Sequence, residues 1–568
     1  MIATKPNRQR SRHRCANRPA GNATEEQVKN NGGQLALQIR RTISALNRVQ
    51  SETRGAGIVE TYTQDANGRL ASVTDATSKT TTYGRDGLER INRVTDATSR
   101  AATITYNAQD AVTQVVDFKY VTTNYTRDVR GNARSEATPD AGTTATTVDA
   151  LGLPSRIVDA LGRASDISRD ALGRPTLITH SPAAGTPAAT PGGKTLTTQL
   201  RYDLTGSTCN ASGQPNASQG RLCEVIDMVD GVTHATTQYQ WDAFGHLTAQ
   251  TQTLSSAVAN HSHQQTTAFT YLASGGGQGD LASITYPSGS VLTHQYNATG
   301  RLTSLLWNGQ PLIENITYNA LDQPLSWTWA FGQSLGFKLP AQRLYNTAGQ
   351  LTASEFATFA PESTGRIGSV MQNLMKPDGA GGWAEEDVPF NALYNALGQL
   401  TSFTAVGTSP EFQWGHTYNY DYNANRTGGT ITANGASMSF TSGLTSNRLT
   451  NAAGITVTTN AAGDITSLLG KTMAYDSAGQ LAEATAVPPC PSGQNCAGQQ
   501  TTLSRFNGWG QRYLRDTPST QTVFTYGSDG FNLLSETTRN LSTSALSTTE
   551  HIYLPTASGP MPVAAVID

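Results

Sequence analysis

The sequence predicts an all-β protein built as one long strip of β-hairpins, and two observations carry this prediction. A turn motif of the form Asp/Asn-x-x-Gly-x recurs at regular intervals, and the segments between turns are rich in Thr, Val, Ile and Tyr. Asp and Asn favour a tight turn because their side chains accept backbone hydrogen bonds, while Gly adopts a positive φ without strain. β-Branched and aromatic residues favour strands. The repeat therefore alternates strands and turns.

Regular repeats are predicted for residues 35–190. The clear copies of the turn begin 21 residues apart, at Asp65, Asp86, Asn107, Asp128, Asp149 and Asp170. A second turn follows about ten residues after the first, for example at Asp75 and Asp96. Ser44 opens a degenerate copy, so the helix-like segment QLALQIRRTISALNRV is predicted to form a strand and a turn. This spacing leaves roughly five or six residues for each strand, the usual length.

Residues 191–568 are predicted to continue the same array with irregular spacing. The turn recurs as NATGRL from Asn297, NALGQL from Asn395 and DSAGQL from Asp476, and Tyr directly precedes each of these copies. Longer insertions interrupt the array at 181–195, 254–280 and 360–388. A lone hairpin is marginal in water, so the hairpins are expected to pair edge to edge into a continuous sheet.

Residues 1–34 are expected to form a basic, disordered leader. The first 24 residues carry Lys5 and five Arg but no acid, and they lack the apolar core of a secretory signal peptide, so export is expected by another route. A contact to phosphate or anionic lipid is the alternative for this segment. No apolar run approaches the ~18 residues that a membrane span needs. With 40 basic and 42 acidic side chains, the chain is not a general nucleic-acid binder.

The units YDSAGQL, YNATGRL and YNALGQL resemble those of the Rhs/YD-repeat family. This family includes bacterial Rhs toxins, the cocoon components of Tc toxins and the YD shell of teneurins. The resemblance covers about residues 40–568. It implies a strip of hairpins wound as a spiral into a hollow shell, which this chain alone could leave incomplete. In the bacterial members, the shell encloses a C-terminal toxin.

The resemblance therefore implies a structural role in toxin encapsulation and interbacterial competition, for a protein that is secreted or at the cell surface. The implied partners are a C-terminal toxin domain or a separate toxin cargo, and secretion-machine components such as type VI spike proteins. Bacterial members carry an H-x-D-H-L-G-T-P-R stretch and a D-P-x-G-L self-cleavage motif, whereas this sequence contains no Asp-Pro dipeptide. No catalytic residue, cofactor or metal is assigned, and the chain is not expected to be an enzyme.

The cysteines fall into two local pairs and one remainder. Cys209 with Cys223, and Cys490 with Cys496, bracket insertions rich in Gly, Ser and Asn. A disulfide within each insertion would link the two sides of a hairpin tip covalently, which is typical of exported proteins. Free thiols are the alternative, and no C-x-x-C spacing favours a metal. Cys15 is left without a partner.

Four further motifs favour structural roles over chemistry. Residues 332–336 match the G-x-S-x-G nucleophile pattern but lie between strand-like segments, so a β-turn is expected. Residues 421–425 begin like a calcium loop, but the Gly and Glu of an EF-hand are missing, so a repeat turn is expected. His261 and His263 form an H-x-H pair with no identifiable third ligand, and the glycines at 275–279 suggest a loop.

A second function remains open at this point, namely a cell-surface adhesin or carbohydrate-binding repeat array that grips surface glycans with exposed Tyr and Trp side chains. Trp307, Trp327 and Trp329 motivate this alternative because they lie close together in the sequence. Packing of the same rings in a core is the competing explanation. The exposure of these side chains distinguishes the two.

Overall fold

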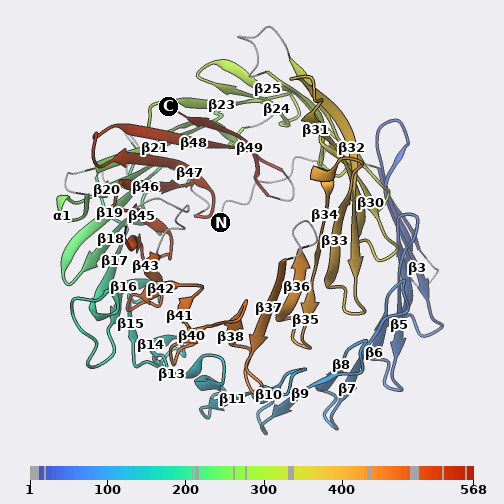
Figure 1. The fold of residues 1–568 in the computed structure, drawn as a ribbon, viewed down its shortest axis with the longest axis horizontal. Helices are drawn as coiled ribbons and strands as arrows, with labels where there is room; N and C mark the ends of the chain where they lie inside the picture. Colours follow the sequence, from blue (N-terminus) through green and yellow to red (C-terminus); the bar gives the residue numbers. More distant parts are fainter. Residues whose placement is uncertain are drawn as a thin grey trace. The chain divides into compact units, whose positions relative to one another are not determined.

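The computed structural model describes residues 12–17, 21–206, 209–211, 217–259, 263–275, 278–330, 338–431, 436–486, 498–527, 530–556 and 559–567. Its described elements are almost all β-strands joined by tight turns (Figure 1). The only described helices are α1 (Ser256–Ala259) and the short 3₁₀ turns η1 (Pro191–Gly193) and η3 (Pro410–Phe412). The all-β prediction is confirmed.

The chain folds into two compact units, and each combines stretches that lie far apart in the sequence. Among the described residues, unit 1 contains 125–312 and 456–567, and unit 2 contains 12–124 and 313–455. We call the earlier stretch of each unit its N-terminal strip and the later stretch its C-terminal strip. Each unit is described by itself below.

The strands of the two N-terminal strips follow in chain order. They are β1 (Arg12–Asn17), β2 (Ala23–Lys29), β3 (Leu35–Ile43), β4 (Val49–Arg54), β5 (Ile58–Gln64), β6 (Leu70–Thr74), β7 (Thr80–Arg85), β8 (Ile91–Thr95), β9 (Ala101–Tyr106), β10 (Val112–Val116), β11 (Thr122–Arg127), β12 (Ala133–Thr138), β13 (Gly142–Val148), β14 (Pro154–Val158), β15 (Ala164–Arg169), β16 (Pro175–Ser181), β17 (Leu196–Tyr202), β18 (Leu222–Val229), β19 (Val232–Trp241), β20 (Leu247–Leu254), β21 (His263–Tyr271), β22 (Leu281–Thr285), β23 (Val291–Tyr296) and β24 (Leu302–Trp307).

The remaining strands form the two C-terminal strips, with β25 beginning at the end of the preceding strip. They are β25 (Gln310–Tyr318), β26 (Pro324–Trp329), β27 (Leu339–Gln342), β28 (Leu344–Tyr345), β29 (Leu351–Ala353), β30 (Ala357–Pro361), β31 (Ile367–Pro377), β32 (Trp383–Tyr394), β33 (Leu400–Val406), β34 (Gln413–Thr417), β35 (Asn419–Tyr420), β36 (Arg426–Ile431), β37 (Ala436–Ser442), β38 (Leu449–Ala452), β39 (Ile455–Thr456), β40 (Thr458–Thr459), β41 (Ile465–Leu468), β42 (Lys471–Tyr475), β43 (Leu481–Ala486), β44 (Gln500–Phe506), β45 (Arg512–Asp516), β46 (Thr520–Tyr526), β47 (Leu533–Asn540), β48 (Leu546–Leu554) and β49 (Met561–Ile567).

Successive strands within a strip pair antiparallel, as hairpins laid side by side. In unit 1 this holds from β12 to β24 and again from β40 to β49, and in unit 2 from β1 to β11. The helix-like segment of the sequence forms β3, a turn that begins at Ser44, and the start of β4, as predicted. Pairing with both neighbours satisfies the backbone of each inner strand.

The repeat turn closes each hairpin through a carboxylate or amide oxygen. At the first copy, Asp65 Oδ1 accepts hydrogen bonds from the backbone N–H groups of Asn67 and Arg69, both at 2.9 Å. The N–H of Gly68 donates to the Asp65 carbonyl at 2.9 Å, and Gly68 has a φ of +77°. The pairing register shifts beside the turn, between Thr63 and Gln64. This combination is a type I turn with a bulge, which needs a left-handed residue at its fourth position.

The Tyr that precedes many turns has a definite role. Tyr106 Oη donates to the carbonyl of Ile91 at 2.7 Å, and Tyr296 Oη donates to the carbonyl of Leu281 at 2.8 Å. Each accepting carbonyl lies where the strand of the preceding hairpin begins. Arg169 occupies the same position in its repeat and reaches the carbonyl of Pro154 at 2.9 Å. The position therefore calls for a long side chain that ends in a hydrogen-bond donor.

Residues 1–34, expected to be a disordered leader, contain two strands where the structure describes them. Residues 12–17 form β1 and residues 23–29 form β2. β1 pairs with β2, and β2 pairs with β3 from Glu25 to Lys29. Glu25 accepts hydrogen bonds from Gln38 and Arg40, so acids just beyond the basic run bind this segment to the strip. The charge run of this segment gives no sign of these strands.

Candidate functional site

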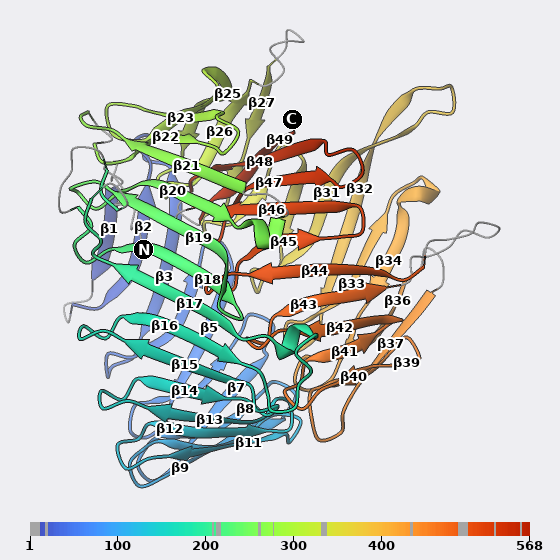
Figure 2. The ribbon, with the colours of Figure 1, turned by 90° about the vertical axis from the view of Figure 1, so that its left-hand side faces the viewer.

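The two strips of unit 1 meet along one line, which we call the seam (Figure 2). The seam joins residues 140–288 of the N-terminal strip to residues 461–551 of the C-terminal strip. Hydrogen bonds cross it at intervals along its length: Arg163 Nη2 to Asp464 Oδ2 (3.0 Å), Ser477 Oγ to the His180 carbonyl (3.1 Å), Gly508 N to Asp227 Oδ1 (3.0 Å), Gln252 Nε2 to the Phe524 carbonyl (3.2 Å), Gln265 Nε2 to Thr537 Oγ1 (2.9 Å) and Tyr286 Oη to the His551 carbonyl (2.9 Å).

At one end of the seam, two turns interlock through glycines. A Cβ atom on Gly142 would lie 2.4 Å from the Ala160 Cβ and 2.9 Å from the carbonyl oxygen of Ala461. A Cβ atom on Gly463 would lie 2.3 Å from the carbonyl oxygen of Asp140. Both glycines have positive φ angles, +71° and +89°. Only a residue without a side chain fits these two positions.

Next along the seam, Arg163 bridges three backbone or side-chain oxygens. Its guanidinium lies 2.5 Å from Asp159 on its own turn and 3.0 Å from Asp464 on the C-terminal strip, and it contacts the Asp476 carbonyl at 3.4 Å. The Arg163 side chain is only 10% exposed. Burial raises the pKa of the neighbouring Asp476 carboxyl. The guanidinium therefore supplies charge compensation where two acidic turns meet.

Farther along, a buried carboxyl holds the strips together. Asp227 Oδ1 accepts from Thr198 Oγ1 at 2.7 Å and from the Gly508 backbone N–H at 3.0 Å. Burial raises the pKa of Asp227 to about 6, against which these two hydrogen bonds act only in part. Asp227 is 6% exposed, and its Oδ2 is buried without a hydrogen-bond partner among the described residues.

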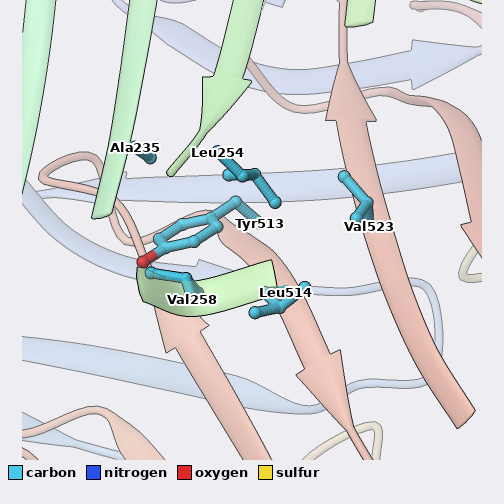
Figure 3. Close-up of a cluster of buried hydrophobic side chains, with 6 residues drawn as sticks. All are labelled: Ala235, Leu254, Val258, Tyr513, Leu514 and Val523. Atoms are coloured by element: carbon cyan, nitrogen blue, oxygen red, sulfur yellow. The ribbon is translucent and has the colours of Figure 1, made fainter. Parts of the chain in front are cut away.

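An apolar cluster completes the seam (Figure 3). Ala235, Leu254 and Val258 come from the N-terminal strip, and Tyr513, Leu514 and Val523 come from the C-terminal strip. All six are buried. The short helix α1 supplies Val258, so the insertion after β20 covers this cluster. Burial of these side chains adds hydrophobic stabilisation to the polar contacts.

Unit 2 has a comparable junction between its own strips. Lys119 Nζ lies 3.1 Å from Asp421 Oδ2 and donates to the Ser446 carbonyl at 3.0 Å. Asn423 Nδ2 donates to Asp117 Oδ2, and the Arg100 guanidinium lies 3.6 Å from the centre of the Tyr422 ring. Asp421 Oδ1 accepts from the backbone N–H groups two and four residues on. The segment 421–425 is thus a repeat turn that serves the junction, as predicted.

The opposite edge of the N-terminal strip of unit 1 carries the same kind of turn but presents apolar side chains to solvent. We call it the free edge, defined by the turns 149–153, 170–174 and 242–246. Leu151 is 74% exposed, Leu172 is 77% exposed and Phe244 is 85% exposed. One strip therefore has one edge built into the seam and one edge in solvent.

The structure places the remaining sequence candidates as follows. Cys209 and Cys223 form a disulfide, which closes the insertion between β17 and β18, and both are fully buried. The predicted Cys490–Cys496 pair, the 332–336 motif and His261 lie outside the described residues, as does the side chain of Cys15. His263 begins β21 opposite Leu254. The described part of the chain contains no cluster of His, Cys, Asp and Glu able to hold a metal.

The three tryptophans do not form one exposed cluster. Trp327 is 2% exposed, and its ring packs edge to face on Trp329 with centroids 5.6 Å apart. Trp307 instead packs on Tyr286 at 5.1 Å. Trp327 is thus a core residue and does not present its ring to a sugar. No helix in the described ranges is long and apolar enough to span a membrane.

The sequence did not reveal the polar side chains of the seam. Buried Thr, Gln and Ser residues occur on both of its sides: Thr198, Gln250, Gln252, Gln265 and Thr267 in one strip, and Thr522, Thr525, Ser535 and Thr537 in the other. In a chain so rich in Thr and Ser, such residues carry no distinguishing signal. One local signal was available, because the C-terminal turns in the seam have a small residue at their second position: Ala461, Ser477 and Gly508.

Comparisons with known proteins agree with this architecture. A family model described as RHS Repeat matches residues 65–101 and 277–306. The chain matches part of the Tc holotoxin pore of Photorhabdus luminescens with a TM-score of 0.64 and 16% identity, over 93% of this chain and 31% of that one. It also matches TcdB2–TccC3 without its hypervariable C-terminal region, with a TM-score of 0.67 and 15% identity, over 95% of this chain and 31% of that one.

At these identities the two structures show a shared fold, and the chain spans about a third of each solved chain. A search of curated proteins finds no match. The turn motif that predicted the strip coincides with one stretch of the family match, since residues 65–101 contain the turns at Asp65, Asp75, Asp86 and Asp96. The RHS repeat match and the shared fold together confirm the resemblance of this chain to the Rhs/YD-repeat family.

Proposed function

We propose that the chain is a structural segment of an Rhs-type shell that encloses a toxin polypeptide for delivery. The observation that carries the proposal is the fold, which matches TcdB2–TccC3 along nearly the whole of this chain. The matched structure lacks the hypervariable C-terminal region of that protein, so this fold stands without it. The role proposed here is accordingly a container, with the cargo supplied by another part of the protein or another chain.

The seam supports this role on physical grounds. A long strip of paired strands cannot bury its apolar side chains by itself, so it needs another layer or strip to pack against. In unit 1 the second strip covers one edge of the first through polar and apolar contacts, so a wide sheet is held without a single central core. Such a wall can enclose a volume that a solid domain would fill with side chains.

The proposed role is non-catalytic, and the protein acts outside the cell that makes it. Its partners are the toxin cargo and components of the secretion machine, and it uses no cofactor. The domain division at residues 34 and 190 stays a prediction for the array as a whole. The alternative of a glycan-binding array loses its main support, because Trp327 is buried and Trp329 packs against it.

Small-angle X-ray scattering of the purified full chain, with negative-stain microscopy, tests the shell. A solid chain of this length has a radius of gyration of about 24 Å, whereas a hollow wall places its mass farther from the centre. We expect a distinctly larger radius and particles with a stain-filled interior. Solid particles with the smaller radius would contradict the proposal, as would the scattering curve of an unfolded chain.

A further inference from the structure

The β31–β32 hairpin of unit 2 extends beyond the sheet that carries it. Its two strands pair from Ser369 opposite Asn391 to Pro377 opposite Trp383. The neighbouring strands β30 and β33 pair only as far as Gln372 on β31 and Phe390 on β32. Within the described ranges, the outer half of the hairpin therefore has no strand partner along either edge.

One face of this outer half is covered. Lys376 Nζ lies 2.8 Å from Glu386 Oε2, and the Ser409 backbone N–H donates to Glu386 Oε1 at 3.1 Å. Val388 is fully buried in a cluster that includes Phe412 of η3. The segment around η3 thus packs against this side of the hairpin and satisfies its buried charge.

The other face, which we call the outer face, is open. Directly paired residues share a face of a hairpin, so four pairs form it. They are Met371 with Pro389, Asn373 with Asp387, Met375 with Glu385, and Pro377 with Trp383. Trp383 is 68% exposed, Met375 52% and Met371 41%.

The composition of the outer face indicates what it can bind. Single exposed apolar side chains are common, but here three large ones gather on one face of a ribbon whose edges are also free. Met adapts its shape to a partner, and Trp is a frequent anchor of interfaces. None of the eight residues is basic, whereas Glu385 and Asp387 are both exposed acids. A partner must therefore bring apolar side chains together with positive charge.

These features favour one kind of occupant over two others. A second copy of the hairpin would place four carboxylates against one another, and an anionic membrane surface would be repelled by the same two. An extended polypeptide can pair with a free strand edge while its side chains alternate between faces. Lys or Arg side chains on it would meet Glu385 and Asp387.

We propose that the outer face of the β31–β32 hairpin binds an extended polypeptide segment that presents both apolar side chains and lysine or arginine on the same face of its strand, at positions two residues apart. The surface is defined by this hairpin alone, so the proposal does not depend on the shell function. It assigns to unit 2 a peptide-docking site that lies apart from the junction of its strips.

The test uses the full chain and a short, dye-labelled peptide of sequence Val-Ser-Lys-Ser-Lys-Ser-Val, which places valine and lysine on one face of an extended strand, with fluorescence anisotropy as the readout. We expect saturable binding that weakens as salt is added, because exposed charges are screened. The variants Glu385→Lys/Asp387→Lys and Met375→Ser/Trp383→Ser should each weaken it by at least about tenfold. Glu136→Lys and Phe244→Ser, which change an exposed acid and an exposed ring elsewhere, are the matched controls.

A charge exchange makes the test specific. The peptide Val-Ser-Glu-Ser-Glu-Ser-Val should bind the wild-type chain poorly and the Glu385→Lys/Asp387→Lys variant at least about tenfold better. Far-ultraviolet circular dichroism checks that each variant keeps its strand content. Absence of saturable binding to the wild type would overturn the proposal, as would equal binding to the hairpin variants and to the controls.

Discussion

The tetrapeptide Asp-Ala-Leu-Gly begins three turns of unit 1, at Asp149, Asp159 and Asp170, and the first two lie on opposite edges of one strip. Asp149 and Asp159 accept equivalent backbone hydrogen bonds from their own turns, and Gly152 and Gly162 both have positive φ. Leu151 is nevertheless 74% exposed at the free edge, whereas its counterpart Leu161 is partly buried at the seam. The same local sequence therefore makes the same turn in two different environments.

The comparison separates what a turn needs from what an edge needs. A turn needs an oxygen acceptor at its first position and a left-handed residue at its fourth. A seam needs in addition close approach of backbones, compensation of charge and burial of apolar groups. Substitutions that leave the turn intact but change the edge should therefore lower the free energy of unfolding strongly at the seam and only slightly at the free edge.

The largest effect is expected for Gly142→Ala. Its Cβ would meet Ala160 and Ala461, and positive φ adds strain, so the free energy of unfolding should fall by about 3 to 4 kcal/mol. Gly152→Ala is the matched control, because its φ is +81° but its nearest neighbour is the flexible Asn132 side chain at 3.3 Å. It should cost about 1 kcal/mol. Urea titration gives both values, and equal losses would contradict the difference between the edges.

Arg163→Ala should give the next largest loss. It leaves Asp159 and Asp464 facing each other without their shared guanidinium, which should cost about 3 kcal/mol. Arg174 also joins two carboxylates, Asp170 and Asp203, but on the free edge. Arg174→Ala should therefore lower the urea midpoint less, because solvent screens the acids that remain. A larger loss of stability for Arg174→Ala than for Arg163→Ala would contradict the proposed role of Arg163 in stabilising the seam.

Asp227 should give the seam a pH dependence. Its pKa is raised from 3.8 to about 6 in the folded chain, so the folded form keeps its proton to higher pH than the unfolded form does. Stability from this group is therefore present below pH ~4 and is lost as the pH rises through ~6, by about 3 kcal/mol. Asp227→Asn should raise the urea midpoint at pH 7.5 and leave it unchanged below pH 4.

Asp203→Asn is a control for that measurement, because its effect on stability should have the opposite sign. The hydrogen bond from Arg174 lowers the pKa of the Asp203 carboxyl, so its contribution is present at neutral pH and is lost on acidification. Asp203→Asn should therefore lower the urea midpoint at pH 7.5. If both Asn variants shifted the urea midpoint in the same direction, burial of Asp227 would not explain the effect of Asp227→Asn.

The smallest effects come from the two leucines of the shared tetrapeptide. Leu161→Ser removes a partly buried side chain and should cost about 1 kcal/mol, whereas Leu151→Ser should change stability by less than about 0.5 kcal/mol. Thermal unfolding monitored by circular dichroism compares them directly. Equal effects would mean that partial burial at the seam adds nothing to stability.

Much of the local structure could be predicted from the residues. The Asp/Asn oxygen and the left-handed fourth position specify the hairpin turn, and the Thr- and Val-rich segments specify the strands between. The strands at 12–17 and 23–29 were not predicted, because the contacts of Glu25 with the next strand cannot be inferred from the charge pattern. The pairing of Cys209 with Cys223 was one of two open possibilities, and the structure contains the disulfide.

The sequence by itself therefore determined the all-β class, the positions of the turns and the antiparallel order of the hairpins, because each depends on residues within about twenty positions of one another. The tertiary structure alone decided which edge of a strip becomes a seam. The partners there lie far apart in the chain, as Arg163 and Asp464 do at a separation of 301 residues. Turns with one local sequence can serve either edge, so only packing between distant strips distinguishes them.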